Sequence, residues 1–313
     1  MPRRLLLLAC TALTLAAQPN AVTKITDGVW MREGDLTGQG HCNNAVIEMK
    51  DYLVVVDANF PSGAEALIAD IKKLSPKPVK YVLLTHHHGD HAYGSAVWTR
   101  GGAITVAHAA VADEIGRYEP ARWQTASKTR ADLRALNVPG LELPKETFTK
   151  SPWTLSDGVR TIEFWHFGWG HTRGDGYVYL PKERVLVTGD AVVNGPHNFT
   201  ADSNLANWPR ALARAQKKLR VEKVIPGHGA AGGAEVLQGQ IQFLTLLRSH
   251  VAGAVKSGKQ LSDLVRMEGD TPKEAKITLP ESVRRWVGGP LPNQIRDAFR
   301  EVSQKKPAGD LPH

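Results

Sequence analysis

A cluster of histidines and a carboxylate constrains this chain more than any other sequence feature. Residues 83–91 read Leu-Leu-Thr-His-His-His-Gly-Asp-His, which places four histidines and an aspartate directly after an apolar run. Imidazole and carboxylate groups crowded at the end of such a run are typical of a metal site. His86 and His88 lie two residues apart, so both side chains point to one side of an extended loop and can share one cation. Asp90 and His91 then point elsewhere, which suits a second cation beside the first.

The first residues of the chain are typical of a secretory signal peptide. Arg3 and Arg4 precede an uncharged run from Leu5 to Ala17. The run ends in small residues, and the polar segment at 18–20 follows it. The run is too short to span a bilayer as a mature helix. We expect cleavage near Ala16 or Ala17, export to the periplasm or beyond, and no membrane span in the mature chain.

Charge and cysteine content narrow the classes of function. The formal net charge is +8 over 313 residues, and the basic side chains are scattered in pairs without interleaved aromatic residues. We expect a solvated basic surface and no nucleic-acid partner. Once the signal is removed, Cys42 is the single cysteine, so no intrachain disulfide can form. We expect this thiol to pack near a turn.

Hydrophobic periodicity divides most of the chain into two similar halves. Each half is predicted to contain a hairpin, a helix, a strand and a histidine loop, in that order. The hairpins end at Asp57 and Asp190, and the loops carry His86 and His228. This ordered duplication predicts two sheets with helices outside them. The candidate ligands would then gather at one edge, where the strand ends meet.

Individual elements follow from apolar alternation and from helical spacing. We expect strands at residues 45–50, 52–58, 79–84, 103–107, 159–167, 177–180, 184–188 and 223–225. We expect helices at residues 62–74, 92–98, 109–117, 121–137, 208–219, 234–257 and near 260–268. Prolines make 139–152 a predicted loop. The remaining segment is predicted to pack on the core with a helix at 294–303, and to end in a frayed tail from Lys305 to His313.

The spacing His86-x-His88-x-Asp90-His91, on the loop after a predicted strand, resembles the signature of the metallo-β-lactamase superfamily. The resemblance covers residues 24 to about 250. It implies an α+β fold, the four-layer αββα sandwich, which agrees with the two predicted sheets. The expected divisions of the chain are a signal peptide at 1–17, a metallo-β-lactamase-fold domain at 24–257, and a C-terminal helical extension and tail at 258–313.

The resemblance also implies the ligands of a dinuclear centre, divided into one set for each cation. The first set is His86, His88 and His171, and the second is Asp90, His91 and His228. Asp190 resembles the carboxylate that bridges both cations. Imidazole and carboxylate donors suit zinc, and we expect two Zn²⁺ per chain. A hydroxide between two zinc ions is a strong nucleophile near neutral pH, and Asp90 is expected to orient it and to take its proton.

Other polar residues carry weaker predictions. Asp57 is expected to support the ligands from behind or to cap a turn. His87 alternates away from its neighbours and is not expected to be a ligand. Trp169, His197 and Asn198 lie near the ligand loops in sequence and are predicted to line the substrate pocket, although packing roles fit them equally.

The fold alone does not determine the substrate, and position 190 is the useful discriminator. The best-known secreted β-lactamases of the superfamily carry a cysteine there and, in many, a lysine three residues later. This chain has Asp190 and Val193. The resemblance therefore implies an exported dinuclear zinc hydrolase that opens an ester, thioester, lactone or amide/lactam bond of a small molecule. The alternatives are a metallo-β-lactamase proper and an iron-dependent persulfide dioxygenase, which holds one iron with two histidines and an aspartate.

Overall fold

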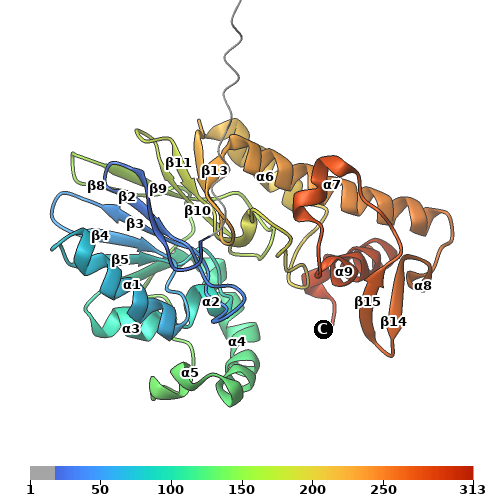
Figure 1. Cartoon of the computed structure of the whole chain (residues 1–313), viewed down its shortest axis with the longest axis horizontal. Coiled ribbons are helices and arrows are strands. Elements are labelled where there is room, and N and C mark those ends of the chain that lie inside the picture. Colours follow the sequence, from blue (N-terminus) through green and yellow to red (C-terminus); the bar gives the residue numbers. More distant parts are fainter. Residues whose placement is uncertain (1–17, 313) are drawn as a thin grey trace, which may run out of the picture.

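Two β-sheets stacked face to face, with helices on both outer faces, form the larger part of the molecule (Figure 1). The computed structural model describes residues 18–312, so the predicted signal peptide at 1–17 lies outside the described residues. The predicted α+β class and its four-layer αββα order are confirmed. In the described part of the chain, no helix combines the length and the apolar character that crossing a bilayer requires.

The first sheet begins with an antiparallel meander and continues with parallel strands. Its strands, in spatial order, are β1 (Val22–Thr26), β2 (Val29–Arg32), β3 (Asn44–Glu48), β4 (Leu53–Val56), β5 (Val79–Leu83), β6 (Ile104–His108) and β7 (Glu146–Phe148). Strands β1 to β4 pair antiparallel, and β4 to β7 pair parallel. The predicted hairpin of β3 and β4 is confirmed.

The second sheet is mostly antiparallel. Its strands, in spatial order, are β13 (Gly232–Gly233), β12 (Lys223–Ile225), β11 (Val185–Val187), β10 (Gly176–Leu180), β9 (Thr161–His166) and β8 (Trp153–Ser156). Only β11 and β12 pair parallel among these described strands. The predicted hairpin of β10 and β11 is confirmed, and its second strand leads into the loop that carries Asp190.

Alternation along the strands gives each sheet two buried faces. In β4, Val54 and Val56 face the space between the sheets, whereas Leu53 and Val55 pack against the helices. Every residue of β4 is buried. The strand therefore has a continuous apolar sequence instead of an alternating one.

Helices cover the outer face of each sheet. The first sheet is covered by α1 (Pro61–Leu74), α3 (Ser95–Arg100) and α4 (Ala109–Thr129), with the short α2 (Gly89–Ala92) and α5 (Ala131–Ala135) beside them. The second sheet is covered by α6 (Trp208–Lys218) and α7 (Ala234–Lys256). The prediction of two helices at 109–117 and 121–137 is wrong, because α4 continues through Pro120, whose ring lies at the exposed side of the helix.

The segment after α7 forms a lobe beside the sandwich (Figure 1). It consists of α8 (Leu261–Leu264), β14 (Val265–Glu268), β15 (Thr271–Ala275), the 3₁₀ helix η2 (Glu281–Trp286), α9 (Leu291–Gln304) and the 3₁₀ helix η3 (Ala308–Asp310). Ile295 and Ala298 of α9 share a core cluster with Leu247 of α7. This burial fixes the lobe to the sandwich, and we call it the C-terminal lobe.

Two predictions for this lobe are wrong. The expected helix near 260–268 is only the single turn of α8, after which β14 and β15 pair as a hairpin. The expected frayed tail is packed, because Ala308 and Leu311 are buried and the Gly309 amide donates to the Ser203 carbonyl at 3.0 Å. Outside this lobe, β7 lies within the predicted loop 139–152, and β8 begins directly after it. Both are short edge strands with little apolar alternation, so the sequence pattern did not indicate them.

Candidate metal centre

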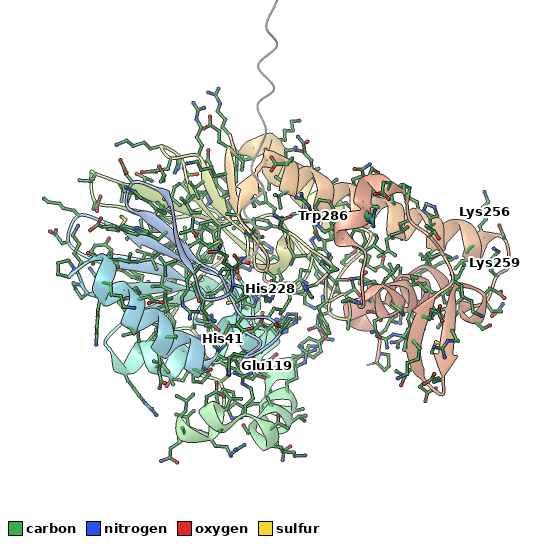
Figure 2. All side chains as sticks on the ribbon, viewed as in Figure 1. His41, Glu119, His228, Lys256, Lys259 and Trp286 are labelled. Carbon is green, nitrogen blue, oxygen red and sulfur yellow. The ribbon has the colours of Figure 1, made fainter. Side chains whose placement is uncertain are left out.

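The predicted ligands come from loops at the carboxyl ends of strands in both sheets. The loop after β5 and helix α2 carry the histidine cluster, the loop after β9 carries His171, and the loop after β12 carries His228. Asp190 lies in the 3₁₀ helix η1 (Gly189–Ala191), directly after β11. Figure 2 shows His228 near the middle of the molecule, between the sandwich and the C-terminal lobe. The strand order therefore brings together residues that are distant in the sequence.

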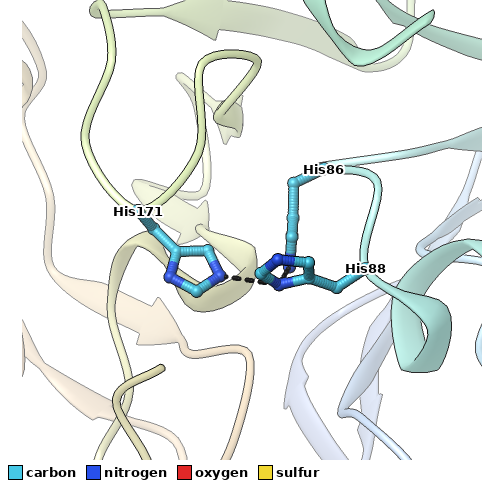
Figure 3. Close-up of side chains that lie close together, drawn as sticks. All are labelled: His86, His88 and His171. Atoms are coloured by element: carbon cyan, nitrogen blue, oxygen red, sulfur yellow. Dashed lines mark hydrogen bonds between the residues drawn. The ribbon is translucent and has the colours of Figure 1, made fainter. Parts of the chain in front are cut away.

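Three imidazoles converge to form the first set (Figure 3). The Nδ1 atom of His88 lies 3.1 Å from Nε2 of His86 and 3.0 Å from Nε2 of His171. Nitrogen ligands around a tetrahedral zinc ion are separated by about 3.3 Å. The three nitrogens are thus spaced as ligands of a single cation are.

The second set contains a carboxylate and two imidazoles. The Oδ2 atom of Asp90 lies 3.0 Å from Nε2 of His228 and 3.4 Å from Nε2 of His91. Its donors are those that zinc and related divalent cations accept. This set is complete, with one oxygen and two nitrogens directed at a common position.

Asp190 lies between the two sets. Its Oδ1 atom is 3.2 Å from Nε2 of His91 and 3.4 Å from Nε2 of His228, and its Oδ2 atom is 3.9 Å from Nε2 of His171. Gly227 makes room for this carboxylate, since a Cβ atom at that position would lie 2.0 Å from Oδ1 of Asp190. The arrangement allows one oxygen to face each cation position.

Partners behind the ligands fix the orientation of the rings. Each such contact occupies the ring nitrogen that does not face the centre: Thr85 Oγ1 with His86 Nδ1 at 3.0 Å, Asp202 Oδ2 with His88 Nε2 at 2.7 Å, Asp57 Oδ2 with His91 Nδ1 at 2.8 Å, and the Phe199 carbonyl with His171 Nδ1 at 3.0 Å. A ring nitrogen that donates backward leaves the other nitrogen as a lone-pair donor for metal. Asp57 therefore lies where sequence reasoning expected a supporting residue.

Asp202 is a functional residue that sequence reasoning missed. Besides His88, it accepts hydrogen bonds from both terminal nitrogens of Arg122, at 2.7 and 2.8 Å. Burial opposes its charge, but hydrogen bonds from His87, His88 and Arg122 outweigh that effect and hold the pKa of Asp202 far below its usual range. Asp202 follows no predicted strand, so nothing in the sequence distinguished it from other polar loop residues.

The electrostatics of two ligands in the first set, and two unsatisfied atoms of the centre, fit a bound cation. Burial, with neighbouring histidines, lowers the pKa of His86 well below its usual value and that of His171 to about 3, so both rings stay neutral as metal ligands must be. The buried atoms Nε2 of His91 and Oδ1 of Asp190 lack a hydrogen-bond partner among the described residues. Buried polar atoms are rarely left unpaired, so these atoms point to a ligand that the residues are arranged to hold.

A pocket of about 610 Å³ opens at the centre. On one side it is lined by His88, Asp90, Asp190 and His228, and on the other by residues of the C-terminal lobe, including Asn293 and Arg296. His197 and Asn198 also line this pocket, as expected of residues near the substrate. Their contact with a substrate stays a prediction.

Trp169 is not among the lining residues of this pocket. Its indole nitrogen donates to the Asp202 carbonyl at 3.0 Å, and the Arg173 guanidinium covers its ring at 3.7 Å. These contacts turn the side chain toward the protein. Trp169 therefore supports the loop of Asp202 and does not form a pocket wall.

His87 and Cys42 lie behind the two sets. The ring of His87 is buried, stacks on Tyr118 and lies 3.4 Å from Oδ2 of Asp202. Cys42 is buried, and burial raises the pKa of its thiol to about 12, so the group is uncharged. The burial of Cys42 agrees with the packing role expected for it, and the expectation that His87 is not a ligand stays a prediction.

Comparison with known proteins assigns the family. Residues 37–228 match the sequence pattern of the metallo-β-lactamase superfamily, which is more than half of the chain. This chain belongs to the metallo-β-lactamase superfamily. The metallo-beta-lactamase type 2 of Bacillus sp. (strain 170) is 25% identical to it over 72% of this chain and 82% of that protein. The lactamase-like protein vrtG of Penicillium aethiopicum is 26% identical over 74% of this chain and 62% of that protein.

A solved structure agrees with this assignment. The metallo-beta-lactamase from Pontibacter korlensis is 26% identical, with a TM-score of 0.58, over 72% of this chain and 98% of that chain. Since members of the metallo-β-lactamase superfamily similar to this chain are hydrolases, the chain is a hydrolase with a histidine and aspartate cluster able to bind metal. The Pontibacter protein is matched almost completely, whereas more than a quarter of this chain extends beyond the match.

Proposed function

We propose that this chain is an exported dinuclear zinc hydrolase that opens an ester, thioester, lactone or amide/lactam bond of a small molecule. The observation that carries the proposal is the position of Asp190, whose two oxygens face different ligand sets. A centre that binds one cation would need only one of the two ligand sets and no carboxylate between them. The uncharged run in residues 1–17 supports export.

The residues of the centre fit two zinc ions, one held by His86, His88 and His171, and one by Asp90, His91 and His228. When bound, zinc lowers the pKa of a coordinated water and polarises the carbonyl under attack. Asp90 lines the pocket, and its side chain is 20% exposed. Its carboxylate is placed to orient the attacking water and to accept its proton as the bond to the leaving group breaks.

β-Lactam cleavage is the second candidate function, and the similarity of this chain to metallo-beta-lactamases favours it. The type 2 metallo-beta-lactamase of Bacillus sp. (strain 170) matches across most of its length. Asp190 in place of a cysteine favours the broader class of esters, thioesters and lactones. Persulfide dioxygenation is less well supported, because one iron leaves His228 and its partners without a function.

The test uses zinc-loaded protein beginning at residue 18 and an Asp190→Ala variant. Zinc per chain is measured by mass spectrometry, and turnover is measured with a chromogenic cephalosporin, a lactone, a thioester and an ester. We expect two zinc ions in the parent chain, turnover of at least one substrate, and loss of both in the variant. Near-parental turnover in the variant, or a single bound iron in protein purified from cells, would contradict the proposal.

A further inference from the structure

A second pocket adjoins the metal pocket and is lined by arginines. It has a volume of about 530 Å³, and its wall includes Arg117 and Arg122 of α4 together with Arg296 and Arg300 of α9. None of its lining residues, all in the described part of the chain, is acidic. We call this the arginine pocket.

The arginine pocket shares part of its wall with the metal pocket. Arg122, Phe199 and Arg296 line both of them. Phe199 is 47% exposed, and its ring lies 5.2 Å from the ring of the ligand His88. A substrate that reaches from one pocket to the other therefore passes over an exposed aromatic surface.

The acidic neighbours of these arginines are already engaged. Asp202 accepts from both Arg122 and His88, as described above. Asp297 receives Nε and Nη2 of Arg296 on one oxygen, while its other oxygen accepts from Thr200 at 2.7 Å. These carboxylates are buried and fixed, so they hold the guanidinium groups in place at the wall of the pocket.

Guanidinium donors remain available on the wall formed by α9. Arg296 uses only Nε and Nη2 on Asp297, and no partner of its Nη1 is found among the described residues. Arg300 donates Nη2 to the Pro312 carbonyl, and residues 18–312 offer it no ion pair. On the other wall, Arg117 is 3.8 Å from Glu114 and half-exposed. Planar guanidinium groups with free donors bind carboxylate and phosphate oxygens in pairs.

We propose that the arginine pocket holds an anionic group, a carboxylate or a phosphate, of the substrate whose scissile bond lies at the metal centre. This proposal rests on the hydrolase function proposed above. Its substrate class is an acyl compound with an apolar portion over Phe199 and an anionic end between α4 and α9. The C-terminal lobe supplies half of the binding arginines and so acts in substrate selection.

The test compares matched esters on the zinc-loaded protein. The 4-nitrophenyl esters of hexanoate and of adipate have the same chain length and differ in the terminal carboxylate, and a third ester ends in a phosphonate. We expect kcat/KM to be about tenfold higher for an anionic ester than for the neutral one, mainly through a lower KM. The anionic ester with the higher kcat/KM shows whether the pocket prefers a carboxylate or a phosphate, which the phosphonate represents.

Variants locate the effect in the arginine pocket. Arg300→Gln and Arg117→Gln, on opposite walls, are each expected to lower the ratio of the anionic to the neutral kcat/KM by about threefold or more, and the double variant to bring it near one. Arg284→Gln is the matched control and leaves the ratio unchanged. Arg284 is an exposed arginine on η2, and within residues 18–312 its ion pair is with Glu281. A parental ratio near one, or a ratio that survives in the double variant, would overturn the proposal.

Failure of the hydrolase proposal is distinguished by a binding measurement. If the zinc-loaded protein cleaves none of the esters, calorimetric titration with adipate is compared between the parent chain and the double variant. Weaker binding by the double variant, with Arg284→Gln unchanged, supports the anionic pocket on its own. Equal binding in all three overturns it.

Discussion

The two walls of the metal pocket are built differently. One wall consists of ligands on loops of the sandwich, where His88 and Asp90 belong to the cluster of ligands at residues 86–91. The facing wall is helix α9 of the C-terminal lobe, whose Arg296 lies more than two hundred residues further along the chain. The ligand wall depends on short sequence spacings in loops that follow strands, whereas the facing wall depends on how a separate lobe packs, and we propose that this lobe selects the substrate.

The largest expected effect comes from removing a ligand on the metal wall. His171→Ala takes away one of three imidazoles of the first set, and we expect kcat/KM to fall by about a thousandfold or more. Zinc content should fall from two ions toward one. His250→Ala, on the exposed face of α7, is the control and should retain both zinc ions. Unchanged turnover in His171→Ala would show that the first set is not needed for activity.

A core substitution in the lobe tests whether the facing wall is fixed to the sandwich. Ile295 of α9 is fully buried in the cluster shared with α7. We expect Ile295→Ala to lower the free energy of unfolding by about 2–5 kcal/mol, measured by denaturant titration. Val159→Ala, at a 60% exposed position, should cost far less. A separate early unfolding transition for the lobe would contradict a single packed unit.

A smaller effect is expected for the carboxylate behind the metal wall. Asp202→Asn removes the charge that holds both His88 and Arg122 in place. We expect the affinity for one of the two zinc ions to fall by about 10–100-fold, measured by competition with a chelator. Asp113→Asn, an exposed residue of α4, provides the matched comparison. Parental zinc affinity in Asp202→Asn would remove Asp202 from the support of the centre.

The smallest effect on metal content is expected at His87. This buried histidine lies beside Asp202 and Glu119 and belongs to neither of the two ligand sets. We expect His87→Gln to keep two zinc ions per chain, with a modest loss of stability from imperfect packing. Loss of a zinc ion in this variant would show that His87 belongs to the metal wall.

Burial and spacing made the sandwich predictable from the sequence. The continuous apolar run of β4 and the period of α1 identified these elements, because both patterns arise from which side chains are buried. The lobe was less predictable. The strands β14 and β15 are short and mostly polar, and within them Val265 and Pro272 alone are buried, so the apolar alternation that indicates a strand is weak.

The sequence by itself determined the type of metal ligands and their local spacing, since four of them follow one strand within six residues. Only the tertiary structure decided which side chains orient the ligands from behind and which residues face them across the pocket. His88 and Asp202 are 114 residues apart in the chain, and Arg122 and Asp202 are 80 apart. Such contacts leave no periodic signal in the sequence, because they depend on where loops and helices of separate elements come together in the packed chain.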